Sequence, residues 1–397
     1  MKENILKNCL CLIYPAAVLI YTLNLFFEGV RPGIMLTAVL ILGVVCIFLL
    51  RFVTLKTNED RLFAAYFIFN MLSGIWCVFY GIPVSVYLGE VSTTALPMLM
   101  YYAGRGFTDK ESSRFYQTYI ASALFMGLLG VLLYIWAPQF YLDFSYDNYF
   151  ISVADVETSR VRMNSVIGSG ALAVFLTYGV CLSIVFIRDD SKKKKITGTV
   201  TLILSVLLAF MANQRSAMFS IILMLVFFNV VDYFIYKDKS KKLLWMELLA
   251  AGVFIAGLFI FARGVFEKFY ARLASIPSGF GERSESWVAA VNDMHNIFLG
   301  DGLGSRGHRA AVFQHYIVAD GGLVKLYTEM GVIGTSLIIF LLFLVYKKSL
   351  KNIGAVVGEI AVITCAVLMS VGSNVLEMEL CAPIVYFCLG RAVRKIN

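Results

Sequence analysis

Charged residues are scarce in this sequence. They make up 15% of the 397 residues, whereas about a quarter of the residues in a soluble domain are charged. Hydrophobic residues make up 59%, and the mean hydropathy is +0.79. This composition excludes a soluble enzyme.

Sequence signatures of metal and nucleotide sites are also missing. The eight cysteines all lie in apolar runs, with no Cys-x-x-Cys pair and no neighbouring histidine to complete a metal site. We interpret them as small hydrophobic residues. There is no Walker A sequence, and the Gly300-Asp-Gly-Leu-Gly304 stretch lacks the spacing and the preceding strand of a dinucleotide fingerprint. We therefore expect neither a metal nor a cofactor.

The net charge of +8 has two possible explanations. A basic protein can bind nucleic acid, but here the 34 Lys and Arg residues are spread between apolar runs. That distribution more often orients a membrane protein in the bilayer. We expect no nucleic-acid partner.

Long apolar runs dominate the chain. Crossing a hydrocarbon core of about 30 Å takes about 20 mainly apolar helical residues. Because the runs are continuous and do not alternate, they indicate helices. Twelve such runs occur, and the weakest are 83–104 and 196–212; the set is roughly 9–26, 33–53, 62–80, 83–104, 115–137, 165–187, 196–212, 215–236, 243–262, 321–346, 353–372 and 375–392.

The distribution of Lys and Arg predicts the topology, because basic loops stay on the cytoplasmic side. With both termini inside, cytoplasmic segments hold 23 of the 34 basic residues. No cleavage site of small residues follows the first run, so we expect a retained span and not a signal peptide. The prediction is a single integral membrane domain, 1–397, in a bacterial plasma (inner) membrane.

This topology leaves two long loops, 138–164 and 263–320, and both face outward. The inward connections are short and charged, such as Lys192-Lys-Lys-Lys195, and leave no room for a cytoplasmic nucleotide-binding domain. We expect the chemistry on the outer side, in the 263–320 loop.

Arg215 is the most unusual outer cation. It follows Met211-Ala-Asn-Gln in a tight turn between two apolar helices, so its guanidinium lies at or just under the outer interface. It could snorkel to lipid headgroups or cap the preceding helix. Alternatively, it faces a polar cavity, since ionisable residues within the membrane usually mark a site.

Three further arginines lie in the outer loops: Arg160 and Arg162 before the helix that starts near Ser165, and Arg283 in the larger loop. Each alone is ordinarily a solvated charge. Together they offer several forked, permanently charged donors, which suit a phosphate or diphosphate.

All three histidines, 295, 308 and 315, fall in the 263–320 loop. Their spacing gives no helical metal pair. We interpret His295 and His308 as exposed loop residues. His315 is a candidate proton acceptor, because an unperturbed histidine titrates near neutral pH.

Asp320 precedes Gly321 and Gly322 at the start of an apolar run. It could cap the helix that follows. It could also act as a general base, with the two glycines letting a substrate approach the backbone. Glu90, Glu247 and Glu359 lie in or near predicted spans, where they could line a cavity or snorkel to the interface.

The order of these features resembles that of the O-antigen ligase and polymerase superfamily of bacterial membrane proteins. That family is similar in helix number, in its large periplasmic loop, and in a helix-end arginine like Arg215. Its loop pattern of Arg, then Trp, then Gly-x-Gly-x-Gly is matched by Arg283-Ser-Glu-Ser-Trp287 followed by Gly300-Asp-Gly-Leu-Gly304. The stretch from Arg160 to Asn164 looks like the family's arginine-containing segment.

The ligase signature is only partly present. Gly331-Val-Ile-Gly-Thr335 is intact, but Asp320 stands in the place of the signature's histidine and Gly321 in that of its amide or hydroxyl residue. This departure favours a polymerase over a ligase.

The resemblance implies a fold and an activity. The fold is an all-α, polytopic, GT-C-like bundle of about 12 transmembrane helices with a large extracytoplasmic loop. The activity is a metal-independent glycosyltransfer in which the growing glycan moves from undecaprenyl diphosphate onto another lipid-linked repeat unit. Arg215, Arg283 and Arg160 or Arg162 would bind the diphosphate, and Asp320 or His315 would take the acceptor's proton.

The partners implied are the lipid-linked donor and acceptor, the bilayer and a chain-length regulator. Two alternatives remain: an O-antigen ligase, and a flippase or other transporter of lipid-linked oligosaccharide. Transporters usually show internal repeats and charges at the midplane of the membrane, whereas here no repeat is found and the notable charges gather outside.

Overall fold

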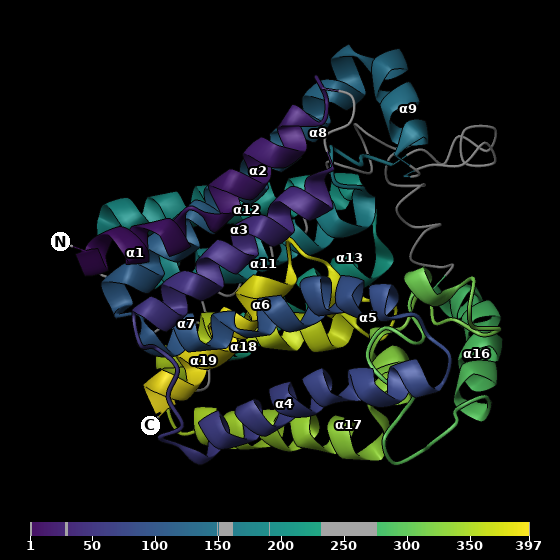
Figure 1. Ribbon diagram of the computed structural model, residues 1–397. Coiled ribbons are helices and arrows are strands. Elements are labelled where there is room, and N and C mark those ends of the chain that lie inside the picture. Colours follow the sequence, from purple (N-terminus) through teal and green to yellow (C-terminus); the bar gives the residue numbers. More distant parts are fainter. Residues whose placement is uncertain are drawn as a thin grey trace.

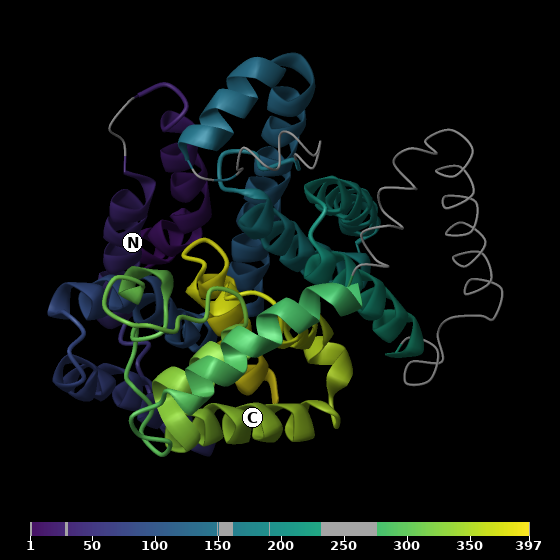
Figure 2. The same ribbon diagram turned by 90° about the vertical axis from the view of Figure 1, so that its right-hand side faces the viewer.

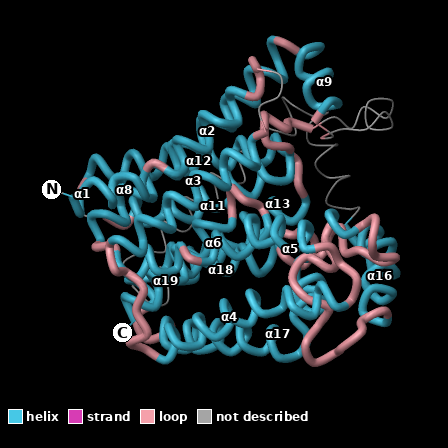
Figure 3. The backbone as a smooth tube through the Cα atoms, viewed as in Figure 1, coloured by secondary structure: helices cyan, strands magenta, loops and turns pink. Residues whose placement is uncertain are grey.

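The computed structural model describes residues 2–27, 31–148, 150, 162–189, 191–231 and 276–396. Arg160, Glu247 and the predicted span 243–262 lie outside these ranges. Within them every regular element is a helix (Figure 3).

The helices of the first half lie between residues 2 and 147. They are α1 (Lys2–Cys11), α2 (Ile13–Leu23), α3 (Pro32–Leu49), α4 (Asn58–Phe79), α5 (Val84–Glu90), the π-helical η1 (Val91–Ala95), α6 (Leu96–Met98), α7 (Met100–Gly106), α8 (Asp109–Trp136) and α9 (Pro138–Asp147).

The second half contains the remaining helices. They are α11 (Ser169–Ile187), α12 (Lys192–Ala212), α13 (Arg215–Val231), α16 (Ile276–Asn292), the 3₁₀ turn η3 (His308–Ala310), α17 (Gly322–Ser349), α18 (Ile353–Met369), the 3₁₀ turn η4 (Val375–Glu377) and α19 (Ala382–Ile396).

Among the described residues, six helices are long and apolar enough to cross a membrane: α3, α4, α8, α11, α12 and α17. The pair α1 and α2, bent by 45° at their junction, would make a seventh span. Helices α13 and α18 are apolar but shorter. The chain is therefore an all-helical protein with several candidate membrane spans.

Local sequence explains where several helices begin and end. Thr57 and Thr108 each form a reciprocal capping box, with Asp60 and Glu111 respectively, so α4 and α8 begin before the apolar runs do. Asn213 adopts the left-handed conformation (φ 52°, ψ 45°) and ends α12, which lets α13 begin two residues later.

The predicted span 83–104 is not one continuous helix. It consists of α5, η1, α6 and α7 in succession. Pro97 lies in this break, and a proline cannot donate the backbone hydrogen bond that a continuous helix requires.

The last predicted span, 375–392, is not one continuous helix, and its helical part, α19, is not among the helices of the described residues that are long and apolar enough to cross a membrane. Helix α19 begins only at Ala382, and Pro383 suits its first turn. Residues 370–381 form a connection that contains η4, so Glu377 and Glu379 lie outside the helical spans. We call residues 370–381 the connecting segment.

Both ends of the chain lie at the same end of the helix bundle (Figure 1). Lys7 of α1 forms an ion pair with Glu111 at the start of α8 (3.0 Å). Arg391 of α19 donates to the carbonyl of Phe107, just before α8 (2.6 Å). The start of α8 therefore connects the first and last helices.

Helix α16 lies at the opposite end, across the ends of other helices (Figure 2). In the interior, α11 packs against α8, α12 and α18. A Cβ at Gly358 would lie 2.3 Å from Val185 Cγ2, so this glycine permits the close approach of α18 to α11. The eight cysteines are all unpaired and seven are buried, as the sequence predicted.

Candidate functional site

The two glycine motifs contact each other and hold the 293–320 loop in place. Helix α17 breaks at Gly331 (φ 59°, ψ −167°), where a Cβ would lie 2.4 Å from the Gly300 nitrogen. The amides of Asp301 and Gly302 donate to the carbonyls of Thr328 and Glu329 (2.9 and 2.8 Å). The glycines therefore serve close backbone packing between the loop and α17.

Arg306 organises the same loop from inside. Its side chain is fully buried and donates through Nη1 to Asp293 (2.7 Å) and through Nε to Asp301 (3.0 Å). Its guanidinium also binds the carbonyls of Asp293 and Tyr316 (2.7 and 3.0 Å). A guanidinium with all these partners is structural, and no substrate can reach it.

Two candidate residues, Arg283 and Asp320, meet outside this core. Arg283 Nη2 lies 3.1 Å from Asp320 Oδ2, and the two side chains are 44% and 50% exposed. Arg283 also donates to the carbonyl of Gly372 (3.1 Å), and the Trp287 indole donates to the carbonyl of Asp320 (2.6 Å). Helix α16 is thereby fastened to both the start of α17 and the connecting segment.

Asp320 does not cap α17. The N-cap is Gly321, and no side chain makes a capping bond there. The two glycines also do not open the backbone to a ligand: a Cβ would lie 2.6 Å from Trp287 Nε1 at Gly321 and 2.9 Å from the Ser373 carbonyl at Gly322. The Asp320 carboxylate forms an ion pair with Arg283 instead of a capping bond.

Arg215 begins α13 at this same end of the bundle. The residue before it, Gln214, donates to Ser373 Oγ (3.0 Å), and Ser373 follows Gly372, which binds Arg283. Arg215 itself is half-buried. The connecting segment thus joins the turn that carries Arg215 to the pair formed by Arg283 and Asp320.

Arg162 lies beside the start of α11. Its carbonyl accepts a hydrogen bond from the buried Tyr141 of α9, whose hydroxyl also accepts one from the Asn164 amide (2.6 Å). Asn164 Oδ1 in turn accepts from the Ser169 amide (3.2 Å). These contacts fix the backbone at Arg162. Arg160 lies outside the described residues.

The histidines are all exposed. His295 stacks on Tyr80 (ring centroids 4.4 Å apart), and its Nδ1 lies 3.4 Å from Asp301. His308 opens η3, and His315 packs edge-on against Tyr316. His295 and His308 are exposed, as predicted, although His308 lies in a 3₁₀ turn and not in an irregular loop.

A buried charge cluster surrounds Lys325 of α17, about one helical turn after Asp320. Lys325 Nζ, 1% exposed, contacts Glu377 (2.5 Å), Glu90 (2.8 Å) and Glu329 (3.5 Å). Arg309 reaches the other oxygen of Glu90 (3.3 Å). We call these five residues the Lys325 cluster. The sequence had singled out only Glu90 among them.

The Lys325 cluster holds three carboxyl groups and two cations, so it cannot be neutral with every group ionised. Burial raises the pKa of the Glu377 carboxyl to about 8; Lys325 opposes this increase, and Glu90 and Glu329 add to it. The Glu377 side chain is 23% exposed, against 5% for Glu90 and 4% for Glu329. Glu377 is therefore the carboxyl of the cluster that exchanges protons most easily with its surroundings.

Glu379 is a second acid on the connecting segment. It makes no hydrogen bond or ion pair with any residue that the structure describes, and its carboxylate oxygens lie 3.5 Å from where a Cβ of Gly33 would be. Burial raises the pKa of Glu379 to about 7, and the charge of Arg309 works against this. The connecting segment thus carries two acidic side chains, and Arg283 and Lys325 contact it from other elements.

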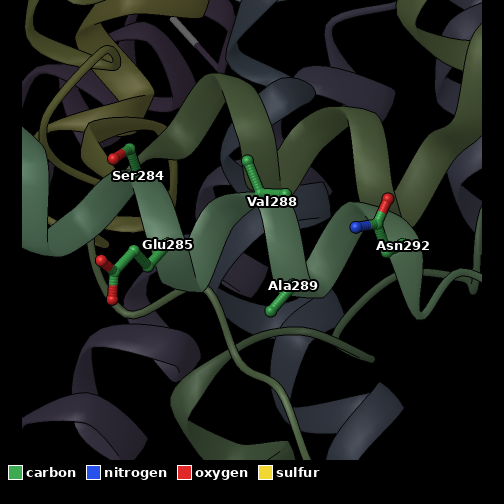
Figure 4. Close-up of a pocket in the computed structure, with 5 residues that line it drawn as sticks. All are labelled: Ser284, Glu285, Val288, Ala289 and Asn292. Carbon is green, nitrogen blue, oxygen red and sulfur yellow. The ribbon is translucent and has the colours of Figure 1, made fainter.

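A hollow of about 400 Å³ lies on α16 and is lined by Ser284, Glu285, Val288, Ala289 and Asn292 (Figure 4). Arg283 and Trp287 occupy the opposite face of this helix, given about 100° of rotation per residue. The hollow is therefore separate from the contacts around Asp320.

No group of three or more His, Cys, Asp or Glu side chains in the described ranges is arranged to hold a metal ion. Two kinds of chemistry are possible around the connecting segment: anion binding and proton exchange. Arg283 can bind an anion through forked donors, and so can Arg215, whose neighbour Gln214 contacts the same segment. Glu377 can exchange a proton.

Sequence reasoning missed Lys325 and Glu377 because each lies in or beside an apolar run that predicts a span. A charged residue inside such a run is itself a signal, since burial of an unpaired charge in the membrane is costly. This signal was applied to Glu90 but not to its partner Lys325.

No protein-family model matches the sequence, and no curated protein does.

Proposed function

We propose that this protein is a bacterial glycan polymerase of the plasma membrane. It spans the membrane twelve times with both termini in the cytoplasm. At the outer face it transfers a growing glycan from undecaprenyl diphosphate onto a lipid-linked repeat unit. The lipid chains lie between helices, and the sugars and diphosphate meet the outer ends of α13, α16 and α17.

The contact between Arg283 and Asp320 carries this proposal. The two residues are 3.1 Å apart, and the connecting segment joins them to the turn that holds Arg215. These are three of the residues that the sequence resemblance marks for donor binding and catalysis. A merely solvated set of loop charges would have no reason to gather around one segment.

The chemistry of the donor explains the arginines. A lipid-linked sugar brings its own leaving group, and the diphosphate gains negative charge as the glycosidic bond breaks. Fixed guanidinium groups stabilise that charge most in the transition state. Arg215 and Arg283 do this in our proposal, together with Arg160 or Arg162. Asp320 holds Arg283 in orientation.

Two rival functions remain open to the same experiment. A ligase would transfer the glycan to a different acceptor, and the intact Gly331-Val-Ile-Gly-Thr335 stretch is compatible with that activity. A flippase would move the lipid-linked sugar across the membrane without extending it, and a buried cluster such as that of Lys325 also occurs in transporters.

The test is chain extension by purified protein in proteoliposomes supplied with an undecaprenyl-diphosphate-linked repeat unit. The wild-type protein should produce longer glycans, and Arg215→Ala should abolish them at an unchanged amount of protein. Arg215→Lys should restore little, because lysine keeps the charge but loses the planar fork. Arg61→Ala, an exposed arginine at the other end of the bundle, is the control.

Transport without extension would establish the flippase. Extension only onto a lipid A-core acceptor would establish the ligase. Normal chain lengths from Arg215→Ala would remove this residue from the donor site.

A further inference from the structure

The transfer needs a group that accepts the proton of the acceptor hydroxyl. Asp320 was the first candidate from the sequence, but half of its side chain faces solvent, and its partner Arg283 (3.1 Å) is the residue that the proposed function assigns to the donor diphosphate. His315 is exposed and packs edge-on against its neighbour Tyr316. Neither residue lies in a site that excludes water.

We infer that Glu377 is the proton acceptor of the proposed transfer and that Lys325 positions it. This inference rests on the proposed function. Lys325 Nζ holds Glu377 Oε2 at 2.5 Å, which orients the carboxyl group, and in this proposal the acceptor hydroxyl meets the second oxygen. Since Lys325 also binds Glu90 and Glu329, its ammonium is itself held from three sides.

The connecting segment brings Glu377 to the same helix start as the diphosphate-binding side. Asn374, three residues before Glu377, donates to the carbonyls of Val318 and Ala319 (3.2 and 3.1 Å), directly before Asp320. Lys325 follows one turn into α17, with its amide bonded to the Gly321 carbonyl (2.9 Å). The start of α17 and the connecting segment therefore bring together a cationic group, Arg283, and a carboxyl group, Glu377.

The step balances as follows. The acceptor hydroxyl oxygen forms a bond to the anomeric carbon of the donor, and the bond from that carbon to the phosphate oxygen breaks. The electron pair leaves with undecaprenyl diphosphate beside Arg283 and Arg215. The hydroxyl proton passes to the Glu377 carboxylate and later to water.

The charges around Glu377 set the pH dependence. Lys325 and Glu329 face it from α17 and Glu90 faces it from α5, while Arg309 from η3 binds Glu90. Burial raises the pKa of Glu377 to about 8. A base must be deprotonated to act, so the rate should rise with pH and level off above about 8, the pKa that this group carries.

The experiment is the chain-extension assay in proteoliposomes, run from pH 6 to 9. The wild-type rate should rise through the Glu377 titration. Glu377→Gln should lower the rate by about 10²–10⁴-fold and remove the rise, because an amide cannot accept the proton. Glu377→Ala should be equally slow, and added formate should restore part of its rate by supplying a carboxylate in the vacated space.

Two matched variants distinguish a catalytic from a structural role. Glu329→Gln removes another carboxyl partner of Lys325, one that is only 4% exposed. It should keep the rise in rate but move it to lower pH, because it removes a negative charge that opposes ionisation of Glu377. Asp320→Asn should keep the rise at its wild-type pH while weakening donor binding, seen as a larger KM.

Extension by the wild type together with an unchanged pH profile in Glu377→Gln would overturn the inference and leave the proposed function standing. An inactive Glu377→Ala that formate does not rescue would also overturn it. If the wild-type protein extends no glycan, both the inference about Glu377 and the proposed polymerase function are refuted.

Discussion

Exposure separates the arginines at the α16 end of the bundle into two groups with different roles. Arg306 is buried and has a carboxylate or carbonyl partner at each nitrogen of its guanidinium group. Arg283 is 44% exposed and keeps donors that face solvent. The first arrangement maintains the loop, and the second can accept an anionic ligand.

Replacement of Arg306 tests this distinction. Arg306→Ala leaves Asp301 buried without its partner, and breaking a buried pair in this way costs about 3–5 kcal/mol. We expect a lower thermal unfolding midpoint and faster proteolysis within residues 293–318. Arg61→Ala, which replaces an exposed arginine of α4, should cost no more than about 1 kcal/mol. Equal losses in both variants would contradict the buried role of Arg306.

Within single elements, apolar runs predicted helix cores well and helix ends poorly. The run 115–137 lies almost wholly within α8 (Asp109–Trp136), because continuous apolar side chains determine that part. The true start depends on the capping box at Thr108, in a stretch that hydropathy scores as polar.

The candidate site was predictable only in part, for a related reason. Arg283 and Asp320 stand out as charges in a predicted outer loop, but their contact depends on how α16 meets α17. Lys325 and Glu90 are 235 residues apart, and no periodicity connects residues at that separation. Tertiary packing alone brings them together.

The glycine motif makes a prediction at the element scale. Gly302 (φ +93°) and Gly81 (φ +86°) share a conformation that disfavours a side chain, by about 1–2 kcal/mol. A Cβ at Gly302 would lie 2.5 Å from the Ser73 carbonyl, whereas nothing lies within 4 Å at Gly81.

Gly302→Ala should therefore cost more than Gly81→Ala and reduce the yield of folded protein. Size-exclusion profiles and unfolding midpoints of the two variants measure the difference. If both variants lose the same stability, backbone strain alone explains the need for glycine at position 302, and close packing does not contribute.

For the molecule as a whole, the contacts at the start of α8 keep both termini at one end of the bundle, while α16 lies at the other (Figure 1). Cytoplasmic termini would then place α16 and the connecting segment outside, in agreement with the distribution of basic residues.

Reporter fusions test this orientation. A fusion after Lys195 should report the cytoplasm, and one after Arg283 the opposite side, because an odd number of predicted spans separates them. A fusion after Lys351 serves as a second cytoplasmic reference. Signals from the same side at Lys195 and Arg283 would refute the twelve-span topology.

The long-range ion pairs have a consequence for the synthesis of the chain. Glu90 is synthesised 235 residues before its partner Lys325, and Asp109 is synthesised 282 residues before its partner Arg391. At about 5–20 residues per second, a ribosome needs roughly ten to sixty seconds to supply these cations. During that interval early carboxylates are in the membrane or at its surface without their counter-ions. Asp109, 87% exposed, can stay hydrated during that interval, whereas Glu90, only 5% exposed in the folded protein, must be protonated, hydrated or shielded until Lys325 emerges.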